Sequence, residues 1–311
     1  MVLLLEENTV EVYQHIQIFV IILLRKDDIN MPNHVANKIE FYGDQENINK
    51  VLEFIKGEED CIDFEKLIPM PKTLHLTSGG YQNDAIQYAL SKKKNPERIA
   101  IQVELTKIKC DFYGNYFSKI FAYDRLASDK LQERADDFEE QLKNGKKDVF
   151  DNTDYEGLGI KTFEDLGNVY INNILTYGYD TWYDWCCANW GTKWGAYDTY
   201  IDKNTNIMEF NTAWSCPLPI LDKLAEICYE HEVEFSGKWA DEDRGHNVGT
   251  FESGDCMDDE YCFYYEYIEN CSNEAYDIYV ELHGESQCMG KDENGNWISY
   301  DCDNCPNADN C

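Results

Sequence analysis

The chain has 311 residues, 43% of them hydrophobic and 14% aromatic, and is long enough to bury a sizeable core in one large domain or two smaller ones. Its 60 acidic residues against 27 basic ones give a net charge of -33, which repels nucleic-acid phosphates at long range. We therefore expect no direct nucleic-acid binding, and partners with basic surfaces instead. An acidic surface that serves only solubility is the alternative.

The acidic residues are concentrated near the end of the chain. Residues 241–311 hold 19 Asp and Glu but only two basic residues, Arg244 and Lys291, which marks a distinct C-terminal region. Its last part, residues 284–311, has no hydrophobic periodicity. We expect this part to be an acidic, Cys-rich and loosely ordered tail.

Thirteen cysteines are scattered along the chain. Such scatter is more typical of small buried side chains in a reducing cytoplasm than of a disulfide framework. The closest approach to a zinc pattern is the pair Cys302 and Cys305, and a structural zinc site usually needs two such pairs. We therefore predict no cofactor, with zinc at this pair as the alternative.

Residues 1–30 contain one apolar run, from Ile16 to Leu24, which is too short to span a bilayer. The acidic residues before it are unlike the basic start of a signal peptide. We therefore expect no membrane association and a cytoplasmic location. Our hypothesis is that translation starts naturally at Met31 and that 1–30 is an upstream extension; a helix packed on the domain is the alternative.

The regular part of the chain begins with a β–α unit. The alternation of Ile39 and Phe41 predicts a strand, and Asp44 is a suitable N-cap for a helix to about Lys56. Residues 62–71, with two prolines, are predicted to be extended rather than helical. A short helix over 84–93 and a strand at 101–105 are expected next.

Two longer helices are predicted within about 128–177. The first runs from Ser128 to Asn144 with a narrow apolar stripe, and the second runs from about Phe163 to Tyr177. We interpret 128–177 as a helical insertion that leads to a tryptophan-rich stretch.

That stretch is residues 182–198, WYDWCCANWGTKWGAYD, in which four tryptophans fall within thirteen residues. Trp182 and Trp185 have the spacing of one helical turn, which favours a packing role where the chain turns from a helix into a sheet. The alternative is an exposed aromatic groove for a base or a peptide. Its candidate binding residues are Trp182, Trp185, Asn189, Trp190, Lys193 and Trp194.

Strands dominate after residue 196. Alternation predicts strands at 197–201, 208–214 and 233–239, and at least one more between 249 and 267. Ser215 is predicted to cap a helix with Pro217 in its first turn, and 273–283 to form a closing helix. This order predicts an α+β fold: a ferredoxin-like antiparallel sheet, about 196–283, with helices packed on one face.

Five segments carry a resemblance to a known family: MPNHVANKIEFYG, IDFEKLIPMPK, the tryptophan-rich stretch, FNTAWSCPLPILDKL and KWADEDRG. Together they resemble the YubB-like family of phages and plasmids over about residues 31–283. The resemblance implies residence on a mobile element and a ferredoxin-like domain, and it implies no activity or catalytic residue. Residues 1–30 and the tail after Gly284 lie outside it.

Two further groups of side chains have residue types that are common in functional sites. Asp241, Asp243 and His246 follow a predicted strand and could hold a divalent cation, although a solvated turn is the expected default. Cys186 and Cys187 have no histidine nearby in sequence, so a thiol nucleophile is not expected there. P-loop, dinucleotide-binding, GxSxG and HExxH motifs are absent from the sequence.

These observations favour a non-enzymatic accessory protein of a phage or mobile element. We expect it to bind a basic host or phage protein through its acidic surface, as a nucleic-acid mimic or an antagonist of host defence. The alternatives are an enzyme or a nucleotide- or metal-binding module that uses the tryptophan-rich groove, and a virion or assembly component. The sequence makes no prediction of oligomeric state.

Overall fold

The computed structural model describes residues 33–58, 61–113, 128–145, 153–255 and 261–300. The chain divides into two compact units, unit 1 (Met1–Asp63 and Gly195–Cys311) and unit 2 (Phe64–Trp194). The predicted start at Met31, the extension 1–30 and the pair Cys302 and Cys305 lie outside the described residues.

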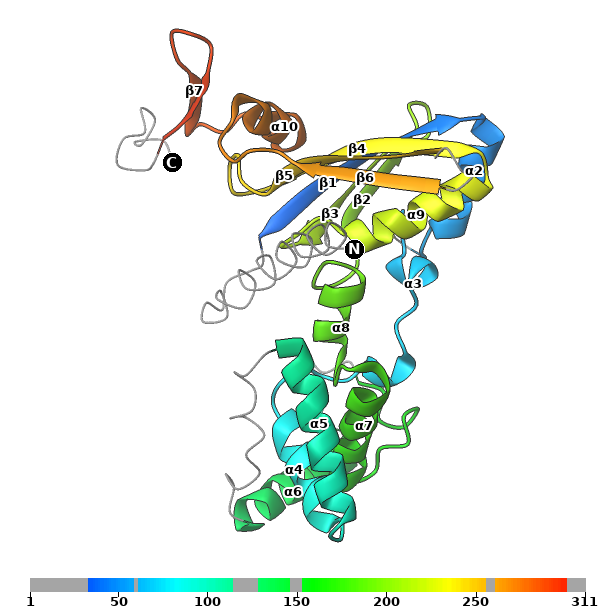
Figure 1. Cartoon of the computed structure of the whole chain (residues 1–311), viewed down its shortest axis with the longest axis vertical. Coiled ribbons are helices and arrows are strands. Elements are labelled where there is room, and N and C mark those ends of the chain that lie inside the picture. The colour runs from blue at the N-terminus through cyan, green and yellow to red at the C-terminus, as the bar shows by residue number, and fades with distance from the viewer. Residues whose placement is uncertain (1–32, 59–60, 114–127, 146–152, 256–260, 301–311) are drawn as a thin grey trace, which may run out of the picture. The chain divides into compact units, whose positions relative to one another are not determined.

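Unit 1 is built on a six-stranded antiparallel sheet with the strand order β2-β3-β1-β4-β5-β6 (Figure 1). Its strands are β1 (His34–Gly43), β2 (Tyr197–Asp202), β3 (Ile207–Ala213), β4 (Val233–Asp241), β5 (Val248–Asp255) and β6 (Tyr261–Tyr267). Two helices complete the central topology, α2 (Gln45–Ile55) after β1 and α9 (Leu218–Glu230) between β3 and β4.

The first four strands and these two helices form the β-α-β-β-α-β arrangement of a ferredoxin-like fold. The predicted fold class is therefore confirmed. The central strand β1 and helix α2 precede unit 2 in the chain, so the fold is assembled from two segments separated by Phe64–Trp194. Strands β5 and β6 extend the sheet beyond β4.

The two faces of the sheet differ in their cover. Side chains that alternate inward, such as Ile39, Phe210 and Trp239, are buried on the face that carries α2 and α9. The closing helix α10 (Asn273–His283) packs on the other face, where its residues form a cluster with Ala240 and Val248. Helices α2 and α9 thus lie on one face, as predicted, whereas the predicted closing helix α10 packs at one end of the other face.

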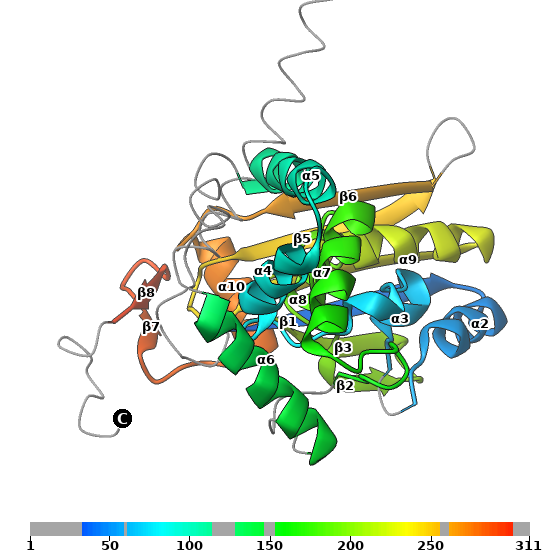
Figure 2. The same cartoon turned by 90° about the horizontal axis from the view of Figure 1, so that it is seen from below.

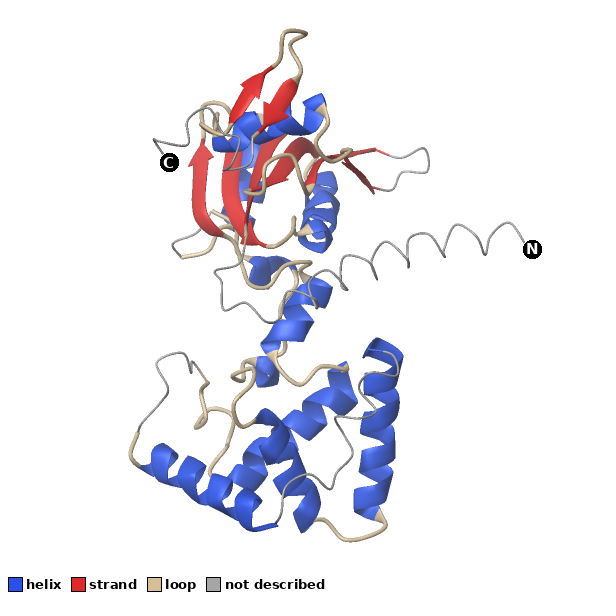
Figure 3. Ribbon diagram, turned by 90° about the vertical axis from the view of Figure 1, so that its left-hand side faces the viewer, coloured by secondary structure: helices blue, strands red, loops and turns tan. Residues whose placement is uncertain are grey.

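Unit 2 contains only helices and loops in its described part (Figure 2 and Figure 3). Phe163 is fully buried at its centre, where its ring contacts those of Tyr81, Tyr88 and Phe138. The elements are α3 (Phe64–Leu67), a 3-10 turn (Lys72–Leu74), α4 (Gln82–Lys92), α5 (Glu97–Tyr113), α6 (Ser128–Lys143), α7 (Phe163–Tyr177) and α8 (Trp182–Asn189).

Two predictions in unit 2 were wrong. Residues 101–105 belong to helix α5 instead of a strand, because Ile101, Leu105 and Ile108 have helical spacing and lie against the core. Residues 62–71 include the short helix α3, whose Phe64 and Leu67 are both buried. The helices predicted near 84–93, 128–144 and 163–177 are confirmed.

Two predictions in unit 1 were also wrong. Ser215 does not cap α9: the helix begins at Leu218, and Pro217 at the N-cap position makes no side-chain cap bond. The tail contains a hairpin, β7 (Met289–Lys291) and β8 (Trp297–Ser299), within 284–300. Its strands are too short to produce a period-2 pattern in the sequence.

Among the described cysteines, seven are free thiols, and Cys186, Cys216 and Cys228 are buried as small apolar side chains. Cys262 differs from the expectation because it takes part in a disulfide bond. No helix among the described residues combines the length and the apolar composition that crossing a bilayer requires.

Candidate functional site

The tryptophan-rich stretch forms helix α8 and the turn after it. Trp185 and Trp190 are buried, with 6% and 5% of their surface exposed, whereas Trp182 and Trp194 are half-buried. The rings of Trp185 and Trp190 meet edge to face at 5.6 Å. The six predicted binding residues therefore do not form one exposed groove.

Trp190 connects the two ends of unit 2. Its ring packs against Phe64, the first residue of the unit, at a centroid distance of 5.8 Å. Its Nε1 donates a hydrogen bond of 2.8 Å to the carbonyl oxygen of Ile68. This geometry supports the packing interpretation, because the ring of Trp190 is buried and its N–H is already hydrogen-bonded within the protein.

Lys193 is the polar side chain of this stretch that sequence reasoning kept as a candidate. Its Nζ lies 4.5 Å from the ring centroid of Trp194 and 5.8 Å from that of Tyr183. Burial lowers the pKa of Lys193. Asn189, the other candidate, donates to the carbonyl oxygen of Trp185 in its own helix at 2.9 Å, which is a local structural contact.

The neighbouring thiols are held protonated. Burial, together with the carboxylate of Asp184, raises the pKa of Cys187 to about 12. Burial also raises the pKa of Cys186, whose Sγ lies 3.9 Å from the sulfur of Met70. A protonated, buried thiol is a poor nucleophile, as expected for this pair.

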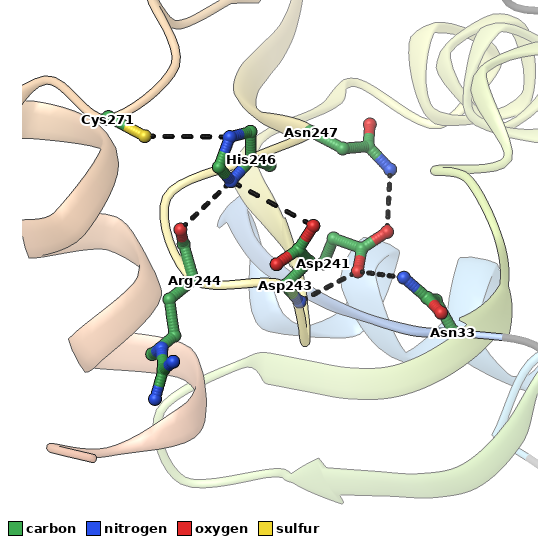
Figure 4. Close-up of polar contacts among 7 residues, drawn as sticks. All are labelled: Asn33, Asp241, Asp243, Arg244, His246, Asn247 and Cys271. Carbon is green, nitrogen blue, oxygen red and sulfur yellow. Dashed lines mark hydrogen bonds and ion pairs between the residues drawn. The ribbon is translucent and has the colours of Figure 1, made fainter. Parts of the chain in front are cut away.

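Asp241, the last residue of β4, organises the loop that follows it (Figure 4). Its carboxylate accepts hydrogen bonds from Asn33 Nδ2 at 3.0 Å, the backbone N–H of Asp243 at 2.9 Å and Asn247 Nδ2 at 3.2 Å. Burial raises the pKa of Asp241, and these hydrogen bonds oppose that effect. The side chain is 5% exposed and acts as a structural acceptor.

Asp243 and His246 point toward each other from the same loop. Oδ2 of Asp243 lies 4.0 Å from Nδ1 of His246, and both side chains are about half exposed. Over the described ranges, no three His, Cys, Asp or Glu side chains come together to hold a metal ion. The cation hypothesis for Asp241, Asp243 and His246 gains no support from this geometry.

The sheet face opposite α2 and α9 carries a group of exposed side chains that sequence reasoning did not single out. Alternation along the strands turns these residues away from the buried face. We call the group the acidic face: Glu40, Glu209, Glu234, Glu252, Glu266, Tyr42, Tyr200 and Tyr264.

Strand register places these residues side by side. Tyr200 pairs with Glu209, which pairs with Lys38. Two residues further along the strands, in the next row on the same face, Glu252 pairs with Tyr264. Tyr200 and Tyr264 are each 59% exposed, and Tyr42 is 44% exposed. Exposed tyrosines next to carboxylates offer both an apolar contact area and negative charge.

The two lysines on this side of the sheet already have an acidic partner. Lys38 and Lys238 are cross-strand neighbours, and their Nζ atoms lie 2.9 Å and 2.7 Å from the two carboxylate oxygens of Glu281 on α10. The hydrogen bond to Glu281 raises the pKa of Lys38. The acidic face therefore keeps an excess of negative charge beside this ion triad.

Unit 1 is thus a ferredoxin-like α+β domain with an open, acidic sheet face. Residues 193–281 of the chain match the family model described as the ferredoxin-like domain in Api92-like protein. The chain is also similar to the crystal structure of protein api92 from Yersinia pseudotuberculosis, with 10% identity and a TM-score of 0.30, covering 71% of this chain and 94% of that one. No curated protein matches the chain. The likeness to the YubB-like family stays a prediction.

Proposed function

We propose that the protein works by binding a basic polypeptide on the acidic face. The observation that carries this proposal is the set of five exposed glutamates and three exposed tyrosines on one side of the sheet. Charge complementarity to Lys and Arg would steer such a partner to the face, and this steering adds to the attraction of the net charge of -33.

The side chains favour a basic polypeptide over a nucleic acid. The cations of this sheet face, Lys38 and Lys238, are engaged by Glu281. Tyrosine rings can pack on the aliphatic stems of Lys and Arg and attract their charged ends. Phosphates, in contrast, would be repelled by the surrounding carboxylates.

The resemblance and the charge extend the proposal. We place the protein on a phage or other mobile element, in the cytoplasm of a bacterial host, where it would occupy the basic groove of a nucleic-acid-binding protein. A surface that presents several carboxylates would compete with nucleic-acid phosphates for the same groove. Such a role needs no catalytic residues, which agrees with the absence of catalytic motifs from the sequence.

Titration of a fluorescent Lys/Arg-rich peptide with the full chain tests the proposal. We expect saturable binding that weakens as salt rises, and about tenfold weaker binding after the double change Glu40→Lys and Glu252→Lys. The matched control is Glu53→Lys with Glu230→Lys, which changes the net charge equally on helices α2 and α9.

Equal weakening by both double variants would mean that only net charge matters, and the assignment to the acidic face would be wrong. A second assay measures whether the chain displaces the same peptide from duplex DNA. Failure to compete, despite peptide binding, would remove the nucleic-acid-mimic part and leave the basic-peptide part standing.

A further inference from the structure

Cys271 and His246 form a contact that lies outside the acidic face (Figure 4). Sγ of Cys271, an exposed free thiol, lies 3.6 Å from Nε2 of His246. On the other side of the imidazole, Oδ2 of Asp243 lies 4.0 Å from Nδ1. A thiol, an imidazole and a carboxylate therefore follow one another in space.

The hydrogen-bond partners of His246 indicate which ring nitrogen carries the proton and which can accept one from the thiol. Nδ1 of His246 lies 3.1 Å from the carbonyl oxygen of Arg244, which can only accept a hydrogen bond. The neutral ring therefore carries its proton on Nδ1. Nε2 is left with a free lone pair directed at the Cys271 thiol, as proton transfer from sulfur requires.

A backbone hydrogen bond joins the loop before β5 to the segment after β6 beside this pair. Strands β5 and β6 form a hairpin, so the residues just before β5 and just after β6 become neighbours. The backbone N–H of Cys271 donates to the carbonyl oxygen of Gly245 at 2.8 Å, and Cys271 has a left-handed φ of 59°. The hydroxyl of Ser272 then caps α10. Thiol and imidazole are both anchored by their backbones.

Tyr276, one turn into α10, adds a second polar group at the sulfur. Burial, followed by a hydrogen bond to Cys271, raises the pKa of Tyr276. The phenol therefore stays protonated at neutral pH and can donate to the sulfur. A donor beside the sulfur stabilises the negative charge that develops when the thiol loses its proton.

We propose that Cys271 and His246 form a nucleophilic thiol–imidazole pair that exchanges with small cationic disulfides. As Sγ of Cys271 bonds to one sulfur of the small molecule, the S–S bond breaks and the thiol proton passes to Nε2 of His246. The departing thiolate takes up that proton. The products are a mixed disulfide on Cys271 and one free thiol, and the disulfide itself is the oxidant.

The charge around the pair selects for a cationic disulfide. Asp243 lies beside the imidazole, and Glu269 and Glu274 flank Cys271 within three residues along the chain, all three with exposed side chains. Arg244 is the opposing positive charge in the same loop, and its Nη1 lies 3.2 Å from the hydroxyl oxygen of Ser286. An excess of carboxylates attracts an aminoalkyl disulfide and repels a carboxylated one.

The test measures mixed-disulfide formation on the full chain at neutral pH with cystamine and, separately, with dithiodipropionate. Peptide mass spectrometry resolves Cys271 from Cys61, a half-buried free thiol in the same unit. We expect Cys271 to react about tenfold faster than Cys61, and faster with cystamine than with the dicarboxylate. Added salt should reduce the preference for cystamine.

His246→Gln keeps a polar side chain but removes the base, so it should slow Cys271 about tenfold at neutral pH and leave Cys61 unchanged. Near pH 10, where thiols lose their protons without a base, the two proteins should react alike. Unchanged reactivity of Cys271 in His246→Gln at neutral pH would overturn the proposal. Acceleration of Cys271 in the wild type by EDTA would also overturn it, because a bound metal would then be the partner of the thiol.

Discussion

The indole nitrogen of Trp190 donates a hydrogen bond of 2.8 Å to the carbonyl oxygen of Ile68, although the two residues are 122 positions apart in the chain. Phe64 packs on the same indole, so the entry to the helical unit and its exit are joined at one side chain. A unit inserted between α2 and β2 of another fold needs its ends close together, and Trp190 provides this closure.

Replacing Trp190 with Phe should destabilise unit 2 by about 1–3 kcal/mol, because the carbonyl of Ile68 loses its donor and a cavity remains. The measurement is urea unfolding followed by circular dichroism at 222 nm, where helices dominate the signal. Trp182→Phe is the matched control, since Trp182 is half-buried and should cost less. Equal losses in the two variants would contradict the closure role of Trp190.

The triad of Lys38, Lys238 and Glu281 predicts a pH-dependent contribution to stability. Burial alone would raise the pKa of Glu281, but the hydrogen bonds from Lys238 and Lys38 outweigh it and lower that pKa below 4.5. A lowered carboxylate pKa contributes stability above pH 4.5, and this stability is lost as the pH falls through the folded-state value. The pKa of Lys38 is raised above 10.5, so the stability that Lys38 contributes is fully present below pH 10.5 and is lost only as the pH rises through its folded-state pKa.

Glu281→Gln should therefore lower the free energy of unfolding near neutral pH by at most about 1 kcal/mol, since the three side chains are partly exposed. The difference from the wild type should shrink as the pH falls below 4.5 and through the lowered pKa of Glu281, because the carboxylate then loses its charge in the folded state as well. Thermal unfolding across this pH range is the measurement, with Glu53→Gln on α2 as an exposed control. A difference that stays constant with pH would exclude the ion triad as its source.

Gly249 makes room for the buried ring of Trp239 in the neighbouring strand. The two residues are register partners, and a Cβ on Gly249 would collide with the Cζ2 and Cη2 atoms of that ring. Gly249→Ala should destabilise unit 1 by about 1–3 kcal/mol through overpacking. Gly254→Ala is the control in the same strand, because its Cβ would meet only a glutamate oxygen at 3.9 Å. Comparable unfolding midpoints for the two variants would contradict this assignment.

Local patterns were sufficient for much of unit 1. Strand alternation and the cap at Asp44 each depend on residues close in sequence, and each is confirmed. The interrupted topology could not be predicted in this way. The position of β1 between β3 and β4 is a long-range pairing, which no local period encodes.

Long-range pairing also explains what sequence reasoning missed at the candidate sites. The acidic face collects residues from all six strands, and its charge pattern exists only once register is known. The sequence pattern indicated His246 only as a metal ligand and did not indicate Cys271. Alternation predicts at least one strand between 249 and 267, but it does not predict the pairing of β5 with β6 that brings residues 246 and 271 together.

Two buried thiols can report on the two units separately. Cys186 in unit 2 and Cys228 in unit 1 are 1% and 0% exposed, and burial raises the pKa of both. Neither should react with a thiol reagent at about pH 8 except through local or global opening, so their labelling rates measure the stability of each unit.

We expect Trp190→Phe to speed the labelling of Cys186 about tenfold or more and to change that of Cys228 little. Gly249→Ala should instead speed the labelling of Cys228 and change that of Cys186 little. Peptide mass spectrometry after timed labelling in native buffer measures both rates in one sample. If each variant accelerated both cysteines equally, the units would unfold as one cooperative block. In that case, neither Trp190 nor Gly249 would stabilise one unit alone.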